Sequence, residues 1–251
     1  MLIAVDIGNS RIKAGKFIEN RISEFHSFKD LNDILSFLQS NSEDNIAVSS
    51  VVPEKTNIIA EEIKKITGRS PFIITKDIKT NLTIDYKTPE TLGIDRLCSA
   101  EGAFLLFKNS EKYKNYKEGS YILSIDFGTA TTINMIDYPG RFIGGLIAPG
   151  IDTMFESLKL RTSQLPLLSI SNFVSTIGKD TKSSIASGVV ISLVGMIEKT
   201  INNLSAQNVF VYLTGGNAKK IIPHLNFEFV YEEGLVLYGI NALYEMNKTT
   251  L

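Results

Sequence analysis

The sequence contains few of the side chains that bind structural metals or form disulfides: one cysteine and two histidines in 251 residues. One cysteine cannot form a disulfide within the chain, and this set is too small for a structural zinc site. Neither charge sign is in excess, because 26 lysines and arginines stand against 27 aspartates and glutamates. Since nucleic-acid-binding proteins usually carry a basic excess, no nucleic-acid partner is expected.

Long apolar runs are also missing, since no stretch approaches the roughly 20 residues of a membrane-spanning helix. The first residues lack the basic region and long apolar core of a secretory signal. The composition, 43% hydrophobic and 21% charged, is that of a globular chain with a sizeable core. We therefore expect a cytoplasmic protein in a reducing compartment, with no membrane partner.

Three common sequence signatures of nucleotide and metal sites are absent. The chain has no G-x-x-x-x-G-K-[ST], no G-x-G-x-x-G and no H-E-x-x-H segment. These absences exclude a P-loop, a Rossmann dinucleotide fold and a zinc protease of the zincin type. If the protein binds a nucleotide, it must hold the phosphates with a different device.

The first half of the chain predicts a meander followed by alternating strands and helices. Breaks at Gly8-Asn9 and at residues 19–21 divide the first 28 residues into three short strands. Residues 44–52 and 71–75 predict strands on either side of a helix over 53–66, an order that favours a parallel crossover. A further helix is predicted from Leu97 to Phe107, followed by a polar loop.

The second half begins in the same way as the first. Residues 121–150 predict three strands, and a long helix is expected from about Thr181 to Leu204. A strand, a short helix and another strand then lead to a closing helix from Gly234 to Met246. We predict two similar α/β halves, residues 1–115 and 116–251.

Each half opens with a strand that ends in Asp-x-Gly, at Asp6 and at Asp126. Such a strand holds the carboxylate rigidly, and the glycine lets the backbone approach a phosphate closely. A carboxylate placed in this way can also bind Mg²⁺ together with nucleotide phosphates. One copy is equally well explained as an ordinary strand turn, but two copies favour turns that face one another across a ligand cleft.

A third candidate segment lies between these turns, where Gly93 precedes the adjacent acid and base Asp95 and Arg96. An aspartate at the start of a helix can accept the proton of a substrate hydroxyl, and arginine offers a forked donor set to a carboxylate or phosphate. A favourable charge at a helix N-terminus explains the same pair without any function. Glycines at 144–150 and 213–218 admit a nucleotide against the backbone or simply form turns.

The segments DIGNS, LGIDR, DFGTATT and GGLIAPG occur in this order, at residues 6–10, 92–96, 126–132 and 144–150. In this respect the chain closely resembles type III pantothenate kinases, members of the acetate kinase, sugar kinase, Hsp70 and actin superfamily. The resemblance implies two ribonuclease H-like halves, with mixed sheets flanked by helices and a cleft between them. It also implies transfer of the ATP γ-phosphoryl group to pantothenate, the first step of coenzyme A synthesis.

The resemblance also implies roles for individual residues. Asp95 would be the general base, Asp126 the ligand of the monovalent cation K⁺ or NH₄⁺, and Asp6 the residue that manages Mg²⁺. Contacts with ATP are implied for Asp6, Ile7, Gly8, Asn9, Ser10, Arg11, Ile12, Lys13 and Thr129. Contacts with pantothenate are implied for Tyr86, Gly93, Ile94, Asp95, Arg96 and Thr181. Because Thr181 would reach pantothenate from a partner subunit, a homodimer is implied.

The chain departs from the family pattern at Ser10, Asn134 and Ser192. Ser10 keeps the hydroxyl of the more usual threonine, whereas Asn134 stands where many relatives carry an acid. Ser192 lies in the long helix, at a place that is often glycine. Two alternatives to the assigned activity are a transcriptional regulator of the Bvg accessory factor type and another kinase or phosphatase of the superfamily. The complete set of acids and the LGIDR segment favour the pantothenate kinase.

Overall fold

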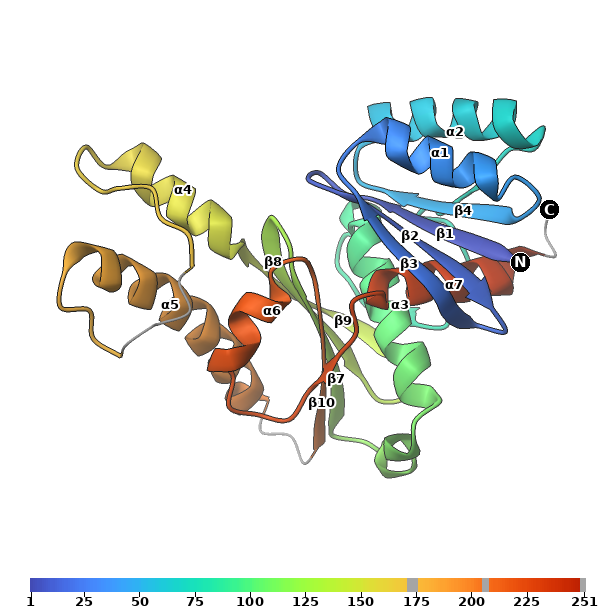
Figure 1. Ribbon diagram of the computed structural model, residues 1–251. Helices are drawn as coiled ribbons and strands as arrows, with labels where there is room; N and C mark the ends of the chain where they lie inside the picture. Colours follow the sequence, from blue (N-terminus) through green and yellow to red (C-terminus); the bar gives the residue numbers. More distant parts are fainter. Residues whose placement is uncertain (171–175, 205–207, 249–251) are drawn as a thin grey trace. The chain divides into compact units, whose positions relative to one another are not determined.

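A computed structural model describes residues 1–170, 176–204 and 208–248 of the chain (Figure 1). The chain divides into two compact units. The first is made of Met1–Glu118, Asn134–Gly144 and Gly234–Leu251, and the second of Gly119–Ile133 and Gly145–Glu233. The predicted halves, 1–115 and 116–251, are a different division of the chain and stay a prediction.

The first unit contains a five-stranded sheet in the order β3-β2-β1-β4-β5. Strands β1 to β3 form the predicted antiparallel meander, and β4 and β5 extend it in parallel with β1. The predicted crossover between β4 and β5 is therefore confirmed, although β5 is only two residues long. The strands are Leu2–Ile7, Ile12–Ile18, Arg21–Phe28, Asn45–Ser50 and Phe72–Ile73.

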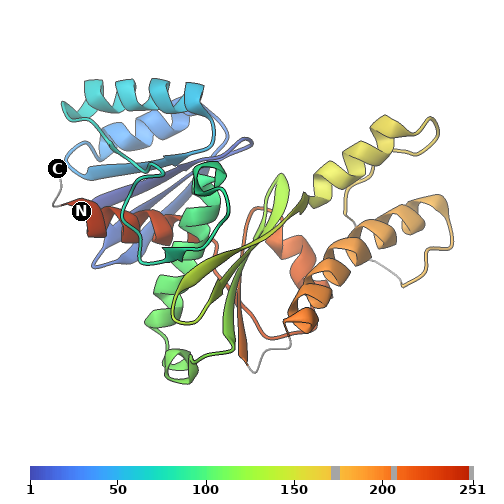
Figure 2. The same ribbon diagram turned by 180° about the vertical axis from the view of Figure 1, so that it is seen from behind.

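Helices cover both faces of this sheet (Figures 1 and 2). Helices α1 (Leu31–Ser40) and α2 (Pro53–Thr67) pack on one face, and α3 (Ile94–Lys108) and α7 (Leu235–Asn247) on the other. Since side chains alternate along a strand, successive residues of β1 face opposite sides of the sheet. The core under α1 and α2 contains Ile3, Val5, Ile7, Ile34, Leu38, Ile59 and Ile63. The intervening residue Asp6 consequently faces the layer of α3 and α7.

Helices α3 and α7 approach each other closely through two glycines. A Cβ added to Gly239 would lie 1.8 Å from the carbonyl oxygen of Cys98, and one added to Gly102 would lie 2.0 Å from that of Leu235. No side chain fits at such distances, so the crossing requires glycine on both helices. The crossing fixes α3, which carries Asp95 and Arg96, against the helix that covers β1.

We expect Gly239→Ala to lower the free energy of unfolding by about 1–3 kcal/mol, the usual effect of an overpacked core. The matched control is Gly216→Ala, because Gly216 is exposed and an added Cβ there meets nothing within 4 Å. That control should be neutral or stabilising, because alanine has less conformational freedom than glycine in the unfolded chain. Denaturant midpoints check both, and equal midpoints for the two variants would contradict the close crossing.

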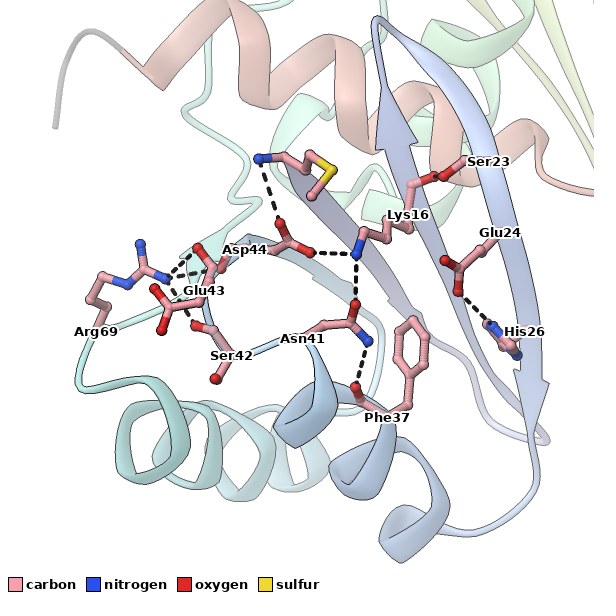
Figure 3. Close-up of polar contacts among 11 residues, drawn as sticks. Lys16, Ser23, Glu24, His26, Phe37, Asn41, Ser42, Glu43, Asp44 and Arg69 are labelled. Atoms are coloured by element: carbon pink, nitrogen blue, oxygen red, sulfur yellow. Dashed lines mark hydrogen bonds and ion pairs between the residues drawn. The ribbon is translucent and has the colours of Figure 1, made fainter.

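A polar cluster fixes the loop between α1 and β4 (Figure 3). The Asp44 carboxylate is buried and forms an ion pair with Lys16 Nζ at 3.0 Å. The same Lys16 nitrogen donates to Asn41 Oδ1 at 2.7 Å, while Arg69 donates to the carbonyl oxygens of residues 42–44. A pocket of ≈ 180 Å³ lies beside this cluster, and none of the predicted site residues lines it.

The second sheet has six strands in the order β11-β10-β7-β8-β9-β6. Strand β10 pairs in parallel with β7 and places Thr214 opposite Asp126. The chain passes between the two units within β8 and again within β9. The strands from β6 to β11 are Thr83–Ile84, Ser120–Phe127, Ala130–Asp137, Arg141–Pro149, Asn208–Thr214 and Val230–Tyr231.

The second unit contains α4 (Ile151–Arg161), the long α5 (Thr181–Asn203) and the short α6 (Ala218–Ile221). Helix α5 confirms the predicted long helix, and an 18-residue window of it has a mean hydropathy of 1.5. By length and composition α5 could therefore cross a membrane, and the expectation that no segment has this property is wrong. Core helices of soluble proteins pass the same test, and 44% of the window is buried, so this is weak evidence for a membrane span.

Among the α-helices and strands of the described residues, three were not predicted from the sequence: α1, α4 and β6. Helix α3 also begins earlier than predicted, at Ile94, so that Asp95 lies in its first turn. The predicted closing helix is confirmed as α7.

Candidate active site

The first candidate segment is the turn that joins β1 to β2. The Gly8 amide donates to the carbonyl oxygen of Arg11 at 3.0 Å, which closes a tight and exposed connection. Lys55 Nζ lies 3.4 Å from the carbonyl oxygen of Asn9, so a cation stands beside the turn. Asp6 is half-buried one residue before the end of β1. This arrangement suits phosphate, because backbone amides and a lysine lie next to a carboxylate that can hold a cation.

The second segment is the N-terminus of α3, which Gly93 caps with an extended backbone. The Leu97 amide donates to the Gly93 carbonyl at 3.1 Å, and Asp95 lies half-buried in the first turn. A Cβ added to Gly93 would lie 2.5 Å from Asp95 Oδ1, so a side chain at this position would displace the carboxylate. The N-terminus of a helix is a favourable place for a negative charge, and an aspartate there can accept the proton of a ligand hydroxyl.

The buried thiol of Cys98 marks the place where these two segments approach each other. Burial raises the pKa of Cys98 well above its usual value, and the neighbouring Ser49 hydroxyl opposes that rise. The negative charges of Asp6 and Asp95 raise this pKa further. Ser49 pairs with Asp6 across the β1–β4 ladder. The first unit therefore gathers the two predicted acids, one for the cation and one for the proton, around a single point of α3.

Arg96 forms the centre of a buried polar and aromatic cluster. Its side chain is 6% exposed, and Nε donates to Asn134 Oδ1 at 2.8 Å. The guanidinium carbon lies 5.8 Å from the ring centres of both Tyr86 and Phe142. Among the described residues, Nη2 of Arg96 is buried and has no hydrogen-bond partner. A buried donor without a partner is costly, so this nitrogen is available to an anionic ligand such as a carboxylate.

The second unit carries Asp126 at the end of β7, surrounded by glycine turns. Gly215 has φ +102°, and a Cβ added there would lie 2.4 Å from Asp126 Oδ1. A Cβ on Gly150 would lie 2.2 Å from the carbonyl oxygen of Gly128. The carbonyl of Thr129 accepts the Gly150 amide at 2.9 Å. Glycine thus lets the turn at residue 215 approach the Asp126 carboxylate, and lets Gly150 approach the turn at residues 128–129, so closely that no side chain fits at either place.

Thr181 is the first residue of α5, in the second unit, and is exposed. The preceding Asp180 caps the helix by accepting the Ser183 amide at 3.0 Å. Hydrogen bonds from Ser183 hold the pKa of Asp180 below its usual value. The cap fixes the backbone at Thr181 and leaves its side chain exposed, as a contact with a ligand outside this unit requires.

The structure thus brings Asp6, Tyr86, Asp95 and Arg96 into the first unit, whereas the predicted residues Asp126, Thr129 and Thr181 belong to the second. Two cluster residues were missed as site residues: Phe142 and Asn134, the latter noted only as a departure from the family. The one sequence signal for Phe142 was the neighbouring glycine pair at 144–145, which either admits a nucleotide against the backbone or forms a turn.

Comparisons with known proteins point to one family. The family model described as type III pantothenate kinase matches residues 2–203. A type III pantothenate kinase of Persephonella marina is 32% identical over 97% of this chain and 98% of its own length. One of Citrifermentans bemidjiense is 31% identical over 99% of this chain and all of its own length.

Solved structures show the same fold at low sequence identity. A Campylobacter jejuni protein described as a Baf family transcriptional activator superposes with a TM-score of 0.60 at 18% identity, covering 98% of this chain and 99% of its own. Component A of (R)-2-hydroxyglutaryl-CoA dehydratase from Acidaminococcus fermentans gives 0.55 at 14% identity, covering 100% and 99%. These likenesses show the fold alone, with its mixed sheets flanked by helices. The family match and the relatives above 30% identity show that the chain belongs to the type III pantothenate kinases.

Proposed function

We propose that the chain transfers the γ-phosphoryl group of ATP to the primary hydroxyl of pantothenate, the first step of coenzyme A synthesis. The observation that carries the proposal is the N-terminus of α3, where Asp95 stands next to the buried and incompletely paired Arg96. Pantothenate has a hydroxyl at one end and a carboxylate at the other. Such a substrate needs a group that accepts the proton of its hydroxyl and a cation with two hydrogen-bond donors for its carboxylate.

In this scheme Arg96 binds the carboxylate through Nη2 while Asn134 holds Nε. Tyr86 and Phe142 enclose the guanidinium and exclude water from it. Asp95 Oδ accepts the hydroxyl proton as the oxygen attacks the phosphorus. Because phosphoryl transfer depends mainly on alignment and on neutralising charge, the amides of the turn at residues 8–11 would orient the phosphates of ATP. Thr129 would make a further contact with ATP.

Two cations complete the proposal. No group of three or more His, Cys, Asp or Glu side chains in the described part of the chain could hold a metal. A divalent ion at Asp6 therefore needs the nucleotide phosphates as its other ligands, which is how Mg²⁺ usually binds in kinases. Asp126 suits a monovalent cation, since its carboxylate lies in a space lined by glycine backbone. When bound, these ions would neutralise the charge that develops on the transferred group.

We further propose that the enzyme is a cytoplasmic homodimer and that Thr181 contacts pantothenate in the partner subunit. Support comes from α5, where Ile191 is 48% exposed and an added Cβ at Gly188 or Gly195 meets nothing within 4 Å. An exposed apolar residue beside small ones allows another helix to pack closely. Sedimentation of the purified protein measures the oligomeric state directly.

The cation requirement gives the direct test of this function. With ATP and Mg²⁺, we expect ADP release that depends on pantothenate and is faster in K⁺ or NH₄⁺ buffer than in Na⁺ buffer. Asp126→Asn should remove this difference between buffers, because a neutral amide binds a cation much less strongly than a carboxylate. Asp152→Asn, an exposed acid of the same unit that pairs with Lys220, serves as the matched control and should keep the K⁺ effect. Absence of release from folded protein in all buffers would reject the kinase assignment.

A further inference from the structure

Glu101 is a fully buried carboxylate that the proposed mechanism does not use. It lies in the middle of α3 with 0% of its surface exposed, and burial raises its pKa. No lysine, arginine or histidine forms an ion pair with it within the described ranges. Its partners are three N–H groups, which is unusual for a buried acid, since such acids are almost always paired with a cation.

All three donors belong to one short segment that comes before β6. Glu101 Oε1 accepts the backbone amides of Asn81 at 2.8 Å and of Leu82 at 3.2 Å, and Oε2 accepts the Asn81 side-chain amide at 3.1 Å. Asn247 of α7 fastens the same segment two residues earlier. It accepts the Lys79 amide at 3.2 Å and donates to the Lys79 carbonyl at 2.9 Å. Residues 79–82 are therefore anchored to both helices of the glycine crossing.

The anchored segment leads directly to the aromatic wall of the Arg96 cluster. Thr83 donates its amide to the Gly140 carbonyl at 3.0 Å, and Asp85 donates to that of Phe142 at 2.9 Å. The next residue is Tyr86, whose ring meets Phe142 edge to face at 6.0 Å and lies over the Arg96 guanidinium. Strand β6 has only two residues, so its own pairing with β9 is short. The position of Tyr86 depends on what holds the chain before it.

Helix α3 thus holds both sides of the Arg96 cluster. Its first turn presents Asp95 and Arg96, and its second turn holds, through Glu101, the segment that ends at Tyr86. We propose that Glu101 is a positioning residue for the pantothenate site, fixing Tyr86 against Arg96 by anchoring residues 81–82. This inference rests on the proposed function, because pantothenate is the ligand assigned to that site.

The test compares Glu101→Leu with Glu101→Gln in steady-state kinetics. Leucine removes the acceptors at similar volume, and we expect the KM for pantothenate to rise about 10- to 100-fold, the effect of misplacing a binding group by about 1 Å. The KM for ATP should stay within about twofold, since the phosphate turn is separate. Glutamine keeps an oxygen for both backbone amides, and Asn81 can turn its own amide oxygen toward the new NH₂ group. Glu101→Gln should therefore restore the normal KM.

Two further measurements separate positioning from loss of stability. Leu38→Ala, on the opposite face of the sheet, should destabilise the unit and leave the KM for pantothenate unchanged. In Glu101→Leu, amide hydrogen exchange should accelerate in the peptide covering residues 79–86 beyond its rate in Leu38→Ala. If Glu101→Leu does not fold, Asn247→Leu replaces it, with the same expected shift in KM and the same local exchange.

An unchanged KM for pantothenate, an equal rise in the KM for ATP, or failure of Glu101→Gln to restore binding would overturn the proposal. The unmodified protein is assayed first in each series. If it releases no ADP with pantothenate, the proposed function fails, and the exchange data alone then report whether Glu101 anchors residues 79–86. Normal turnover of the unmodified protein with normal KM in Glu101→Leu overturns only the role of Glu101.

Discussion

Replacing Asp95 with asparagine should lower kcat for pantothenate phosphorylation by about 100- to 10,000-fold, the usual contribution of a general base. Asparagine has nearly the same shape but cannot accept the hydroxyl proton. The KM for ATP and the melting temperature should change little, because Asp95 lies in the first turn of α3 and is only half-buried. Single-turnover measurements with saturating ATP check this, since they report the chemical step separately from product release.

Asp33→Asn is the matched control for that experiment. Asp33 lies in the first turn of α1, so its replacement removes the same favourable interaction with a helix N-terminus, on an exposed surface. Both variants should lose a similar small amount of stability, and Asp33→Asn should keep full activity. A kcat of Asp95→Asn within about threefold of the unmodified protein would show that the proton goes elsewhere.

The sequence predicted the strands correctly where an apolar run is flanked by glycine and other turn residues. Helix α1 was missed although Asp30 caps it and Ile34 and Leu38 repeat at helical spacing. That signal was present in the sequence and was not used. Strand β6 is a different case, because its two residues pair only with β9, far along the chain. A strand formed by tertiary contact leaves no periodicity to detect.

The site divides in the same way. Asp95 and Arg96 could be predicted together because they are adjacent in sequence at the start of α3. The contact between Arg96 and Asn134 joins residues 38 positions apart and comes from a strand entering from the second sheet. Glu101 gave no signal either, since a glutamate within an amphipathic helix normally faces solvent. Only the packing of the segment before β6 over α3 reveals its partners.

Arg96→Lys should reduce kcat/KM for pantothenate by about 10- to 100-fold, mainly through KM. The size of this effect follows from the energy of a buried hydrogen bond to a charged group, about 1.5–3 kcal/mol. The cause of the loss is the geometry of the guanidinium. The guanidinium donates to Asn134 through Nε and still has Nη2 for the substrate carboxylate. A lysine ammonium keeps the charge but cannot direct donors in these two fixed directions.

A substrate analogue with a neutral amide in place of the carboxylate distinguishes loss of carboxylate recognition from a general disturbance of the Arg96 cluster. The unmodified protein should use the analogue less well than pantothenate. Arg96→Lys should then add little further loss, because the interaction that it weakens is already absent. Arg141→Lys, an exposed arginine that pairs with Asp137 at 2.6 Å, is the matched control and should leave both substrates unaffected. Equal losses of Arg96→Lys on both substrates would show that the guanidinium supports the aromatic cluster rather than the carboxylate. Nη2 of Arg96 would in that case still lack a partner, and the phosphates of ATP would be the next ligand to test.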